Sequence, residues 1–441
     1  MRKHLLAVAV AATLGMTSFG AHADALSDIF TQGHIDGQLR TYYFSRLYDT
    51  SAVPDASAFS GAALINMQSG TFAGGFSLGA SFLTANSFGT QSNNPAEIDS
   101  TLMGLMGRHE SLSALGQAYV QYQNELMQVR AGYQYLNTPW EGQSDSRVLP
   151  ASYNAVSAVF KPATGWDVYA LRSFEWKSRT SSGYYADNLY YPPTYNGDGM
   201  YGGLGGLPAT AHQFNGTWAL GTSYGVEGFK GQAWYYNFLD FARMGYFEGS
   251  YTFKTGTGFD PFVGAQFVDE SGSGTNFLVT NSTALFGVPG SKVKSSTWGL
   301  TGGVIIPHGR IDLGYNKVAS EAGAVGGGAI ISPYTAAYAT DPLYTTSMIR
   351  GLVEMGPGHA WKAKVTYNVL PNLQVIAAYA KYTTLYRGNS HDVYFDVIYN
   401  LSGYLKGLTL RNRWERSVGG WNLNPGNKPF TYNRVMISYQ F

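Results

Sequence analysis

Basic residues stand two positions apart in several segments of this sequence. Arg411 and Arg413 occur in "LTLRNRWE", and Lys362 and Lys364 occur in "AWKAKVTYNV". If these segments are extended, residues two apart point to the same face, about 7 Å from each other. Guanidinium and ammonium groups form charge-assisted hydrogen bonds with carboxylates. A row of such groups is therefore able to bind a small anion and pass it from one cation to the next.

The segments that carry these residues alternate between apolar and polar side chains. The same alternation occurs in "HIDGQLRTYY", "QAYVQYQ", "LMQVRAGYQY", "DVYFDVIYNL" and the final "RVMISYQF". A period of two indicates β-strands with one apolar and one polar face. The segments are about ten residues long, as tilted strands that cross hydrocarbon must be, and aromatic residues near their ends are typical of an interfacial girdle.

The composition favours strands and turns over helices. Aromatic residues make up 15% of the 441 residues and Gly occurs 55 times. Charged residues make up 13%, about half of the usual share for a soluble protein. There is no cysteine, which excludes disulfides, thiol catalysis and cysteine zinc sites.

The N-terminus is typical of a secretory signal peptide. Arg2 and Lys3 precede the apolar run "LLAVAVAATLGM", and "AHA" before Asp24 is a small-residue cleavage site. The alternative is a membrane anchor, but the apolar run is too short to span a bilayer. We predict that residues 1–23 are removed and that 24–441 form one domain. Removal of two basic residues from 29 leaves 27 against 28 acidic residues, a net charge of −1.

The connections between the segments distinguish two kinds of all-β protein. Short connections such as "VLPNLQ" and "KPATGWD" alternate with long ones at 181–210, 271–296 and 319–346. Short turns on one side and long loops on the other are typical of outer-membrane barrels. In the alternative, a soluble sandwich, the polar faces would meet bulk water. We predict a closed transmembrane antiparallel β-barrel, in which the strand ending at Phe441 pairs with the first strand.

Several stretches resemble the OprD family of substrate-specific outer-membrane porins. They are "GHIDGQLRTYYFSR" (33–46), "VRAGYQYLNTPWEGQSDSRVLPASYNA" (129–155), "YTTSMIRG" (344–351), "GHAWKAKVTYNV" (358–369), "SGYLKGLTLRNRWERS" (402–417) and "NRVMISYQF" (433–441). The sequence departs from the family at "HDVYFDV" (391–397), where a Glu-Trp-Glu cluster is common, and residues 180–345 do not align. The resemblance therefore does not predict which solute this chain transports.

The resemblance implies an all-β barrel of about 18 strands in the outer membrane of a Gram-negative bacterium, as a monomer or homotrimer. It implies inward loops that constrict the pore and a ladder of Arg and Lys along one wall. The expected partners are small solutes, outer-membrane lipid and the barrel assembly machinery, which would recognise Phe441. No nucleic acid, metal or cofactor is expected.

Alternation assigns a set of charged residues to the inner face of such a barrel. The basic ladder is predicted to comprise Arg40, Arg130, Lys362, Lys364, Arg411, Arg413 and Arg434. An acidic counter-wall is predicted from Asp36, Asp312, Asp396 and Glu415. Asp145 and Arg147 are assigned to the constriction loop. They either form a salt bridge within the loop that shapes the constriction or contact the solute directly. For every ladder residue the alternative is that it pairs with a charged side chain on a neighbouring strand and only stabilises the barrel wall.

We therefore expect a channel for passive diffusion of small polar solutes, most of all carboxylate-bearing molecules or amino acids. A less selective general, cation-leaning or sugar porin is the alternative. An enzyme barrel needs a His near a Ser or Asp, and "SHD" (390–392) is the only such cluster. Neighbours on a strand point to opposite faces, so these three residues cannot form a triad and no enzyme is expected. A closed barrel that serves as an adhesin or receptor is a third class.

Overall fold

The computed structural model describes residues 31–99, 110–143, 147–186, 215–274, 292–334, 341–353, 355–385, 388–419 and 428–441. The predicted signal peptide lies outside these residues. Within the described part of the chain, no helix is both long enough and apolar enough to span a membrane.

The chain forms an 18-stranded antiparallel sheet. Its strands are β1 (His34–Tyr48), β2 (Ala56–Gln68), β3 (Phe76–Asn86), β4 (Ser111–Gln123), β5 (Met127–Gln134), β6 (Ser152–Ala163), β7 (Trp166–Lys177), β8 (Thr217–Val226), β9 (Phe229–Phe238), β10 (Ala242–Thr252), β11 (Asp260–Gly272), β12 (Lys294–Ile306), β13 (Gly309–Val318), β14 (Gly358–Leu370), β15 (Leu373–Thr384), β16 (Gly388–Asn400), β17 (Leu408–Gly419) and β18 (Phe430–Gln440).

The sheet closes on itself because β1 pairs with both β2 and β18. The closure extends to the last residue. Gly37 and Phe441 exchange two backbone hydrogen bonds, each of 3.1 Å. The prediction of a closed antiparallel barrel of about 18 strands is confirmed, as is the pairing of the last strand with the first.

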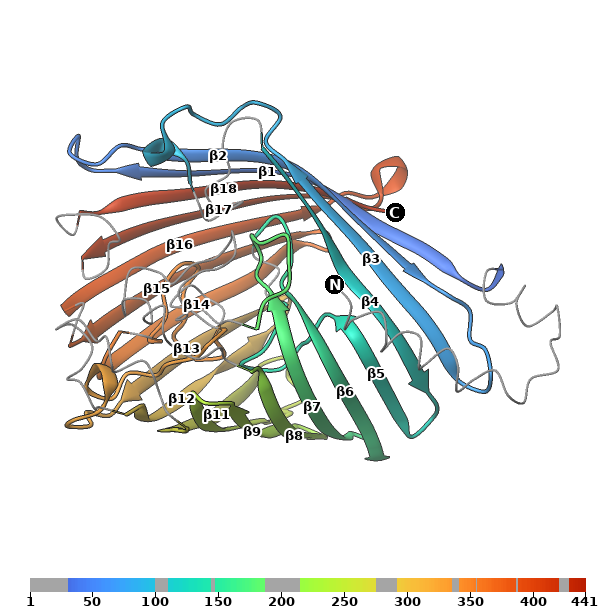
Figure 1. Ribbon diagram of the computed structural model, residues 1–441. Helices are drawn as coiled ribbons and strands as arrows, with labels where there is room; N and C mark the ends of the chain where they lie inside the picture. Colours follow the sequence, from blue (N-terminus) through green and yellow to red (C-terminus); the bar gives the residue numbers. More distant parts are fainter. Residues whose placement is uncertain are drawn as a thin grey trace.

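The two ends of the barrel differ. Connections of two or three residues, such as 124–126, 164–165 and 371–372, lie at the same end as the C-terminus. The loops 135–151 and 319–357 leave from the opposite end (Figure 1). In outer-membrane barrels the short turns face the periplasm and the long loops face outward. We call the two ends the short-turn end and the long-loop end.

The alternating sequence produces an apolar outer face and a polar inner face. Leu39, Leu300 and Leu313 point outward and are 50%, 53% and 59% exposed. Arg40, the neighbour of Leu39, points inward and is only 5% exposed. Apolar side chains on the outer face are stable in contact with lipid. The closed barrel meets the second requirement of a lipid environment, because neighbouring strands satisfy one another's backbone hydrogen bonds.

Two long loops fold into the barrel and pack against its inner wall. In the β5–β6 loop (135–151), the ring of Trp140 lies edge-on to Tyr246 at 6.3 Å. In the β13–β14 loop (319–357), Tyr334 contacts Trp176 at 5.3 Å and Phe238 at 6.3 Å. Trp140, Trp176 and Phe238 are buried. This aromatic cluster fills part of the lumen.

Candidate functional site

Arginines gather on the inner face of three neighbouring strands, β17, β18 and β1. Arg413 lies directly opposite Arg434, which in turn lies opposite Phe44. Arg411 is two residues nearer the short-turn end than Arg413. We call Arg40, Arg46, Arg411, Arg413 and Arg434 the basic wall. Along β1, Arg46 is six positions after Arg40, which corresponds to about 20 Å of strand length.

The basic wall contains one embedded carboxylate. Asp396, on β16, pairs with Arg411 and lies 3.2 Å from Nε of Arg413. Its side chain is 2% exposed, whereas that of Arg411 is 31% exposed. Asp396 therefore orients Arg411 and Arg413 and neutralises part of their charge, while part of the Arg411 guanidinium remains accessible from the lumen.

Aromatic rings separate the arginines along this wall. The guanidinium of Arg434 lies 4.7 Å from the ring centre of Phe44 and 4.6 Å from that of Tyr432. Arg46 lies 4.9 Å from the same Tyr432 ring and 5.2 Å from Phe430. Rings in these positions hold a guanidinium through cation–π attraction, and all three rings are at most 2% exposed.

Arg40 connects the basic wall to the constriction. Its Nη1 donates to the carbonyl oxygen of Val148 at 2.9 Å and to that of Arg147 at 3.3 Å. The β5–β6 loop thus crosses the lumen and is held on β1. Arg147 is buried in this loop, and its role in a constriction stays a prediction. Its predicted neighbour Asp145 lies outside the described residues.

Lys362 and Lys364 belong to a second basic region, a lumenal cavity of about 460 Å³ beside β13 and β14. Arg310 and Lys364 flank Asp312 there, at 2.5 Å and 3.9 Å. Lys362 donates to the carbonyl oxygen of Thr346 at 2.6 Å and so holds the β13–β14 loop. We call this the β13–β14 cavity. It has three cationic side chains and one carboxylate.

The barrel and its inward loops are similar to solved structures of bacterial porins. OccK9 (OpdG) from Pseudomonas aeruginosa matches with a TM-score of 0.73 over 94% of this chain and 99% of that chain, at 16% identity. The chain has the fold of the OprD-type porins. A BenF-like porin from Pseudomonas fluorescens matches with a TM-score of 0.73 at 15% identity, over 94% of this chain and 99% of that one. Acinetobacter baumannii OccAB3 matches with a TM-score of 0.71 at 16% identity, over 93% and 100%. No family model and no curated protein sequence matches the chain.

Arg130 stands apart from both basic regions of this OprD-type barrel. It lies on the inner face of β5, where its Nη2 donates to Gln121 at 2.7 Å and its guanidinium lies 4.1 Å from the Tyr119 ring centre. All seven predicted ladder residues therefore face the lumen. They lie in three regions of the wall rather than in one continuous ladder.

The four predicted acidic residues also face inward, but they do not form a separate opposing wall. Asp36 and Glu415 lie on the same strands as Arg40 and Arg413. Asp36 accepts a hydrogen bond from Asn66 at 2.7 Å. Alternation predicts the face of a residue and not its position around the barrel, so it could not separate these acids from the bases.

Glu415 anchors the β13–β14 loop instead of facing across the pore. Its carboxylate accepts a hydrogen bond from Ser347 at 3.2 Å, and Ser347 also donates to Asp392 at 2.9 Å. Arg350 lies 3.3 Å from Asp392, and both side chains are almost fully buried. This buried group fixes the loop on β16 and β17, beside the basic wall.

Three functional candidates were missed by sequence reasoning: Arg46, Arg310 and Arg350. Arg46 is six residues after Arg40, so an even spacing on the same strand was the available signal. Arg310 is likewise two residues before Asp312. Arg350 lies in a loop, where no periodicity exists, and its buried partner Asp392 is distant in the sequence.

Two buried carboxyl groups lie in the inward loops. Burial raises the pKa of Glu141 to about 7, although Ser173 donates a hydrogen bond to it at 2.9 Å. Burial likewise raises the pKa of Asp341 to about 6, against hydrogen bonds from Thr346 and the backbone of Leu343. Each of the two inward loops therefore contains a carboxyl group that changes charge near neutral pH.

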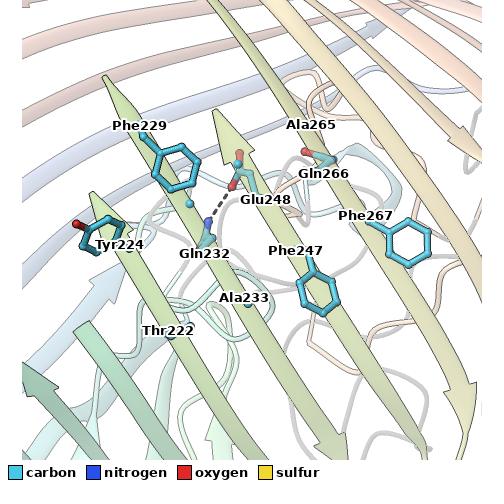
Figure 2. A pocket seen from close by; sticks show the side chains of 12 residues that line it. Thr222, Tyr224, Phe229, Gln232, Ala233, Phe247, Glu248, Ala265, Gln266 and Phe267 are labelled. Carbon is cyan, nitrogen blue, oxygen red and sulfur yellow. Dashed lines mark hydrogen bonds between the residues drawn. The ribbon is translucent and has the colours of Figure 1, made fainter. Parts of the chain in front are cut away.

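A second hollow, of about 440 Å³, crosses β8 to β11. Figure 2 shows Tyr224, Phe229, Phe247 and Phe267 around it, with Gln232 hydrogen-bonded to Glu248 at 2.7 Å. The four aromatic residues are 39% to 52% exposed, on the outer face. This hollow belongs to the apolar outer surface and does not open to the lumen.

The "SHD" segment has the arrangement expected of a strand. Ser390 and Asp392 are buried on the inner face, whereas His391 lies on the outer face and stacks on Tyr379 at 5.8 Å. The three side chains therefore cannot act on one substrate. Among the described residues, no group of His, Asp and Glu side chains is arranged to hold a metal ion.

Proposed function

We propose that this protein is an outer-membrane channel for the passive diffusion of small carboxylate-bearing solutes. The basic wall is the observation that carries the proposal. Arg411 and Arg413 are 31% and 14% exposed, and a carboxylate that leaves one of them meets the other within about 7 Å, so it can exchange one charge-assisted bond for another. No step needs a tight site, and weak sequential sites are what conduction requires.

The β13–β14 cavity supports the same solute class. Arg310 and Lys364 are 45% and 33% exposed, so their charges are accessible from the lumen. Asp312 offers a complementary site for a positive group, such as the ammonium of an amino acid. A solute with a carboxylate would be attracted to this cavity and to the basic wall alike.

An aromatic carboxylate is a suitable first probe of the proposal. Arg434 and Arg46 lie against Phe44, Phe430 and Tyr432, but these rings are at most 2% exposed, so they hold the arginines in place and are closed to a solute. One of the similar structures, Pseudomonas aeruginosa OpdK, was solved with vanillate, which is an aromatic carboxylate. That ligand is a property of OpdK and serves here only to choose the probe.

A sugar porin is the main alternative, and one feature favours it. Trp234, Tyr236 and Phe238 form a stacked row on the inner face of β9, with centroid distances of 5.8 Å and 5.5 Å. A sugar could slide along such a row if the rings were accessible. Tyr236 and Phe238 are fully buried under the inward loops, however, so the row holds those loops and is closed to a solute.

The proposal is tested by flux into proteoliposomes, with benzoate and its neutral analogue benzamide as the two solutes. The variant Arg411→Gln, Arg413→Gln, Asp396→Asn removes the accessible charge of the basic wall and leaves no carboxylate unpaired at position 396. We expect benzoate flux to fall about tenfold, from the loss of charge-assisted bonds, and benzamide flux to stay unchanged. The matched control is Arg416→Gln, on the same strand but outside the lumen.

Equal falls in both fluxes would show that the variant only narrows or distorts the pore. Recovery of benzoate unchanged inside the vesicles is also required, because an enzyme barrel would convert its substrate. Binding of benzoate without any flux would instead indicate a receptor.

A further inference from the structure

The outer face of β12 to β16 contains two rows of the same three residue types. In the first row, Trp298 lies opposite Lys317, and Lys317 lies opposite His359. In the second row, Trp361 lies opposite Lys381, and Lys381 lies opposite His391. We call these six residues the Trp-Lys-His rows. Each crosses three strands, and the second begins on the strand where the first ends.

Both rows lie at the long-loop end of the barrel. Lys317 is the second-last residue of β13, and the long β13–β14 loop follows it. Lys381 is three residues before the end of β15. The outward side chains farther along these strands are apolar, such as Ile311 and Leu313, at 38% and 59% exposed. The lysines thus mark the border between the acyl-chain region and the headgroup region of the outer leaflet.

The aromatic residues of the rows form a continuous band. Trp298 contacts Tyr315 at 5.3 Å, and Tyr315 stacks on His359 at 6.1 Å. Trp361 contacts Tyr379 at 5.1 Å. Trp298 and Trp361 are 41% and 40% exposed. Tryptophan and tyrosine prefer the membrane interface, where the ring meets both acyl chains and headgroups.

The two lysines have no carboxylate beside them. Both are exposed, and neither has an ion-pair partner among the residues that the structure describes. Two other cations at this end are paired: Lys294 lies 2.6 Å from Glu321, and Arg416 pairs with Asp49. From strand spacing and residue rise, Lys317 and Lys381 are about 12 Å apart, close enough for one large headgroup to reach both.

We propose that the Trp-Lys-His rows bind the phosphate-bearing headgroup of an anionic lipid in the outer leaflet. The ammonium groups pair with phosphate, and the aromatic band packs against the sugar or acyl portion below it. Charge complementarity favours a lipid over a second copy of the chain. A twofold contact between copies would bring the same lysines toward each other.

The test measures lipid binding by native mass spectrometry of the full chain in detergent. The probes are bis-phosphorylated lipid A, the same lipid without its phosphates, and inorganic phosphate. We expect the variant Lys317→Gln, Lys381→Gln to bind bis-phosphorylated lipid A roughly 30-fold more weakly than the wild type. The control Lys161→Gln, Lys406→Gln removes two exposed lysines near the short-turn end and should bind it normally. Unchanged heat-modifiable mobility on a gel confirms that each variant is folded.

Equal binding by the wild type and the Lys317, Lys381 variant would overturn the proposal, as would equal binding of the lipid without phosphates. Displacement of the lipid by inorganic phosphate at the same concentration would indicate a free-anion site instead. Loss of a dimer or trimer in the variant, with lipid binding retained, would assign the surface to contact between copies.

Discussion

The Arg40 guanidinium, on the first strand, donates to the carbonyl oxygen of Val148 at 2.9 Å, across 108 residues of sequence. It thereby ties the β5–β6 loop to the wall that also contains Arg411, Arg413 and Arg434. A residue predicted to guide solutes is thus also the anchor of the constriction. Arg40 therefore couples the width of the pore to its charge.

Replacement of Arg40 by Met should release the β5–β6 loop while nearly preserving side-chain volume. A hydrogen bond from a charged group contributes about 1.5–3 kcal/mol, so the undocked loop should become more populated by one to two orders of magnitude. Single-channel recordings should show larger and noisier conductance. Arg130→Met is the matched control, since Arg130 bonds to Gln121 on the neighbouring strand and not to the loop. Quiet, unchanged channels in Arg40→Met would contradict this role.

Lys362 and Lys364 should behave differently although they are two residues apart. Lys364 faces the β13–β14 cavity and is 33% exposed, so Lys364→Gln should weaken carboxylate block of the current by about tenfold and leave gating unchanged. Lys362 holds the carbonyl oxygen of Thr346, so Lys362→Gln should increase gating noise. The check is block of single channels by benzoate. Identical behaviour of the two variants would argue against this division.

The conductance noise should depend on pH through Glu141. Its pKa is raised from 4.5 to about 7 in the docked loop, so docking favours the protonated carboxyl. The docked loop is therefore most stable below pH 4.5, where the carboxyl is protonated whether the loop is docked or not. This stability is lost as pH rises through 7, and the free energy of docking changes by roughly 3 kcal/mol. Gating noise should therefore increase from pH 5 to pH 8. The gating noise of Glu141→Gln should stay low across this range. If the variant keeps the wild-type pH profile, the pH dependence belongs to another group.

The closure of the barrel should tolerate no side chain at position 37. A Cβ on Gly37 would lie 2.6 Å from the carbonyl oxygen of Leu64 and 2.7 Å from the ring of Phe441. Gly37→Ala should destabilise the folded barrel by about 1–3 kcal/mol, because the added Cβ introduces strain. The folded band on a gel should therefore be lost at a lower temperature. Gly225→Ala is the control, because nothing lies within 4 Å of its Cβ position. The recognition of Phe441 by assembly machinery stays a prediction.

The sequence predicted the strands and their faces, because a membrane barrel imposes a strict period of two. Arg40, Arg413 and Asp396 all point into the lumen as that period requires. The length of the segments and the terminal Phe441 indicated closure. These are local properties, and local properties can be read from one chain.

The sequence did not predict which residues meet across the lumen. Arg40 contacts Val148, and Arg350 meets Asp392, only because two long loops fold inward, and no short-range pattern encodes those contacts. Asp396 was predicted to oppose the basic residues and instead lies among them. The pairing of β16 with β17, which places Asp396 beside Arg413, follows from the whole strand order.

The most direct test of the central claim is the reversal potential of the wild-type channel in a planar bilayer under a tenfold potassium chloride gradient, followed by addition of benzoate. The account predicts a potential of the sign that indicates anion preference, and a current that benzoate reduces and benzamide does not. Cation preference, or equal reduction by both solutes, would contradict a pore guided by its basic wall.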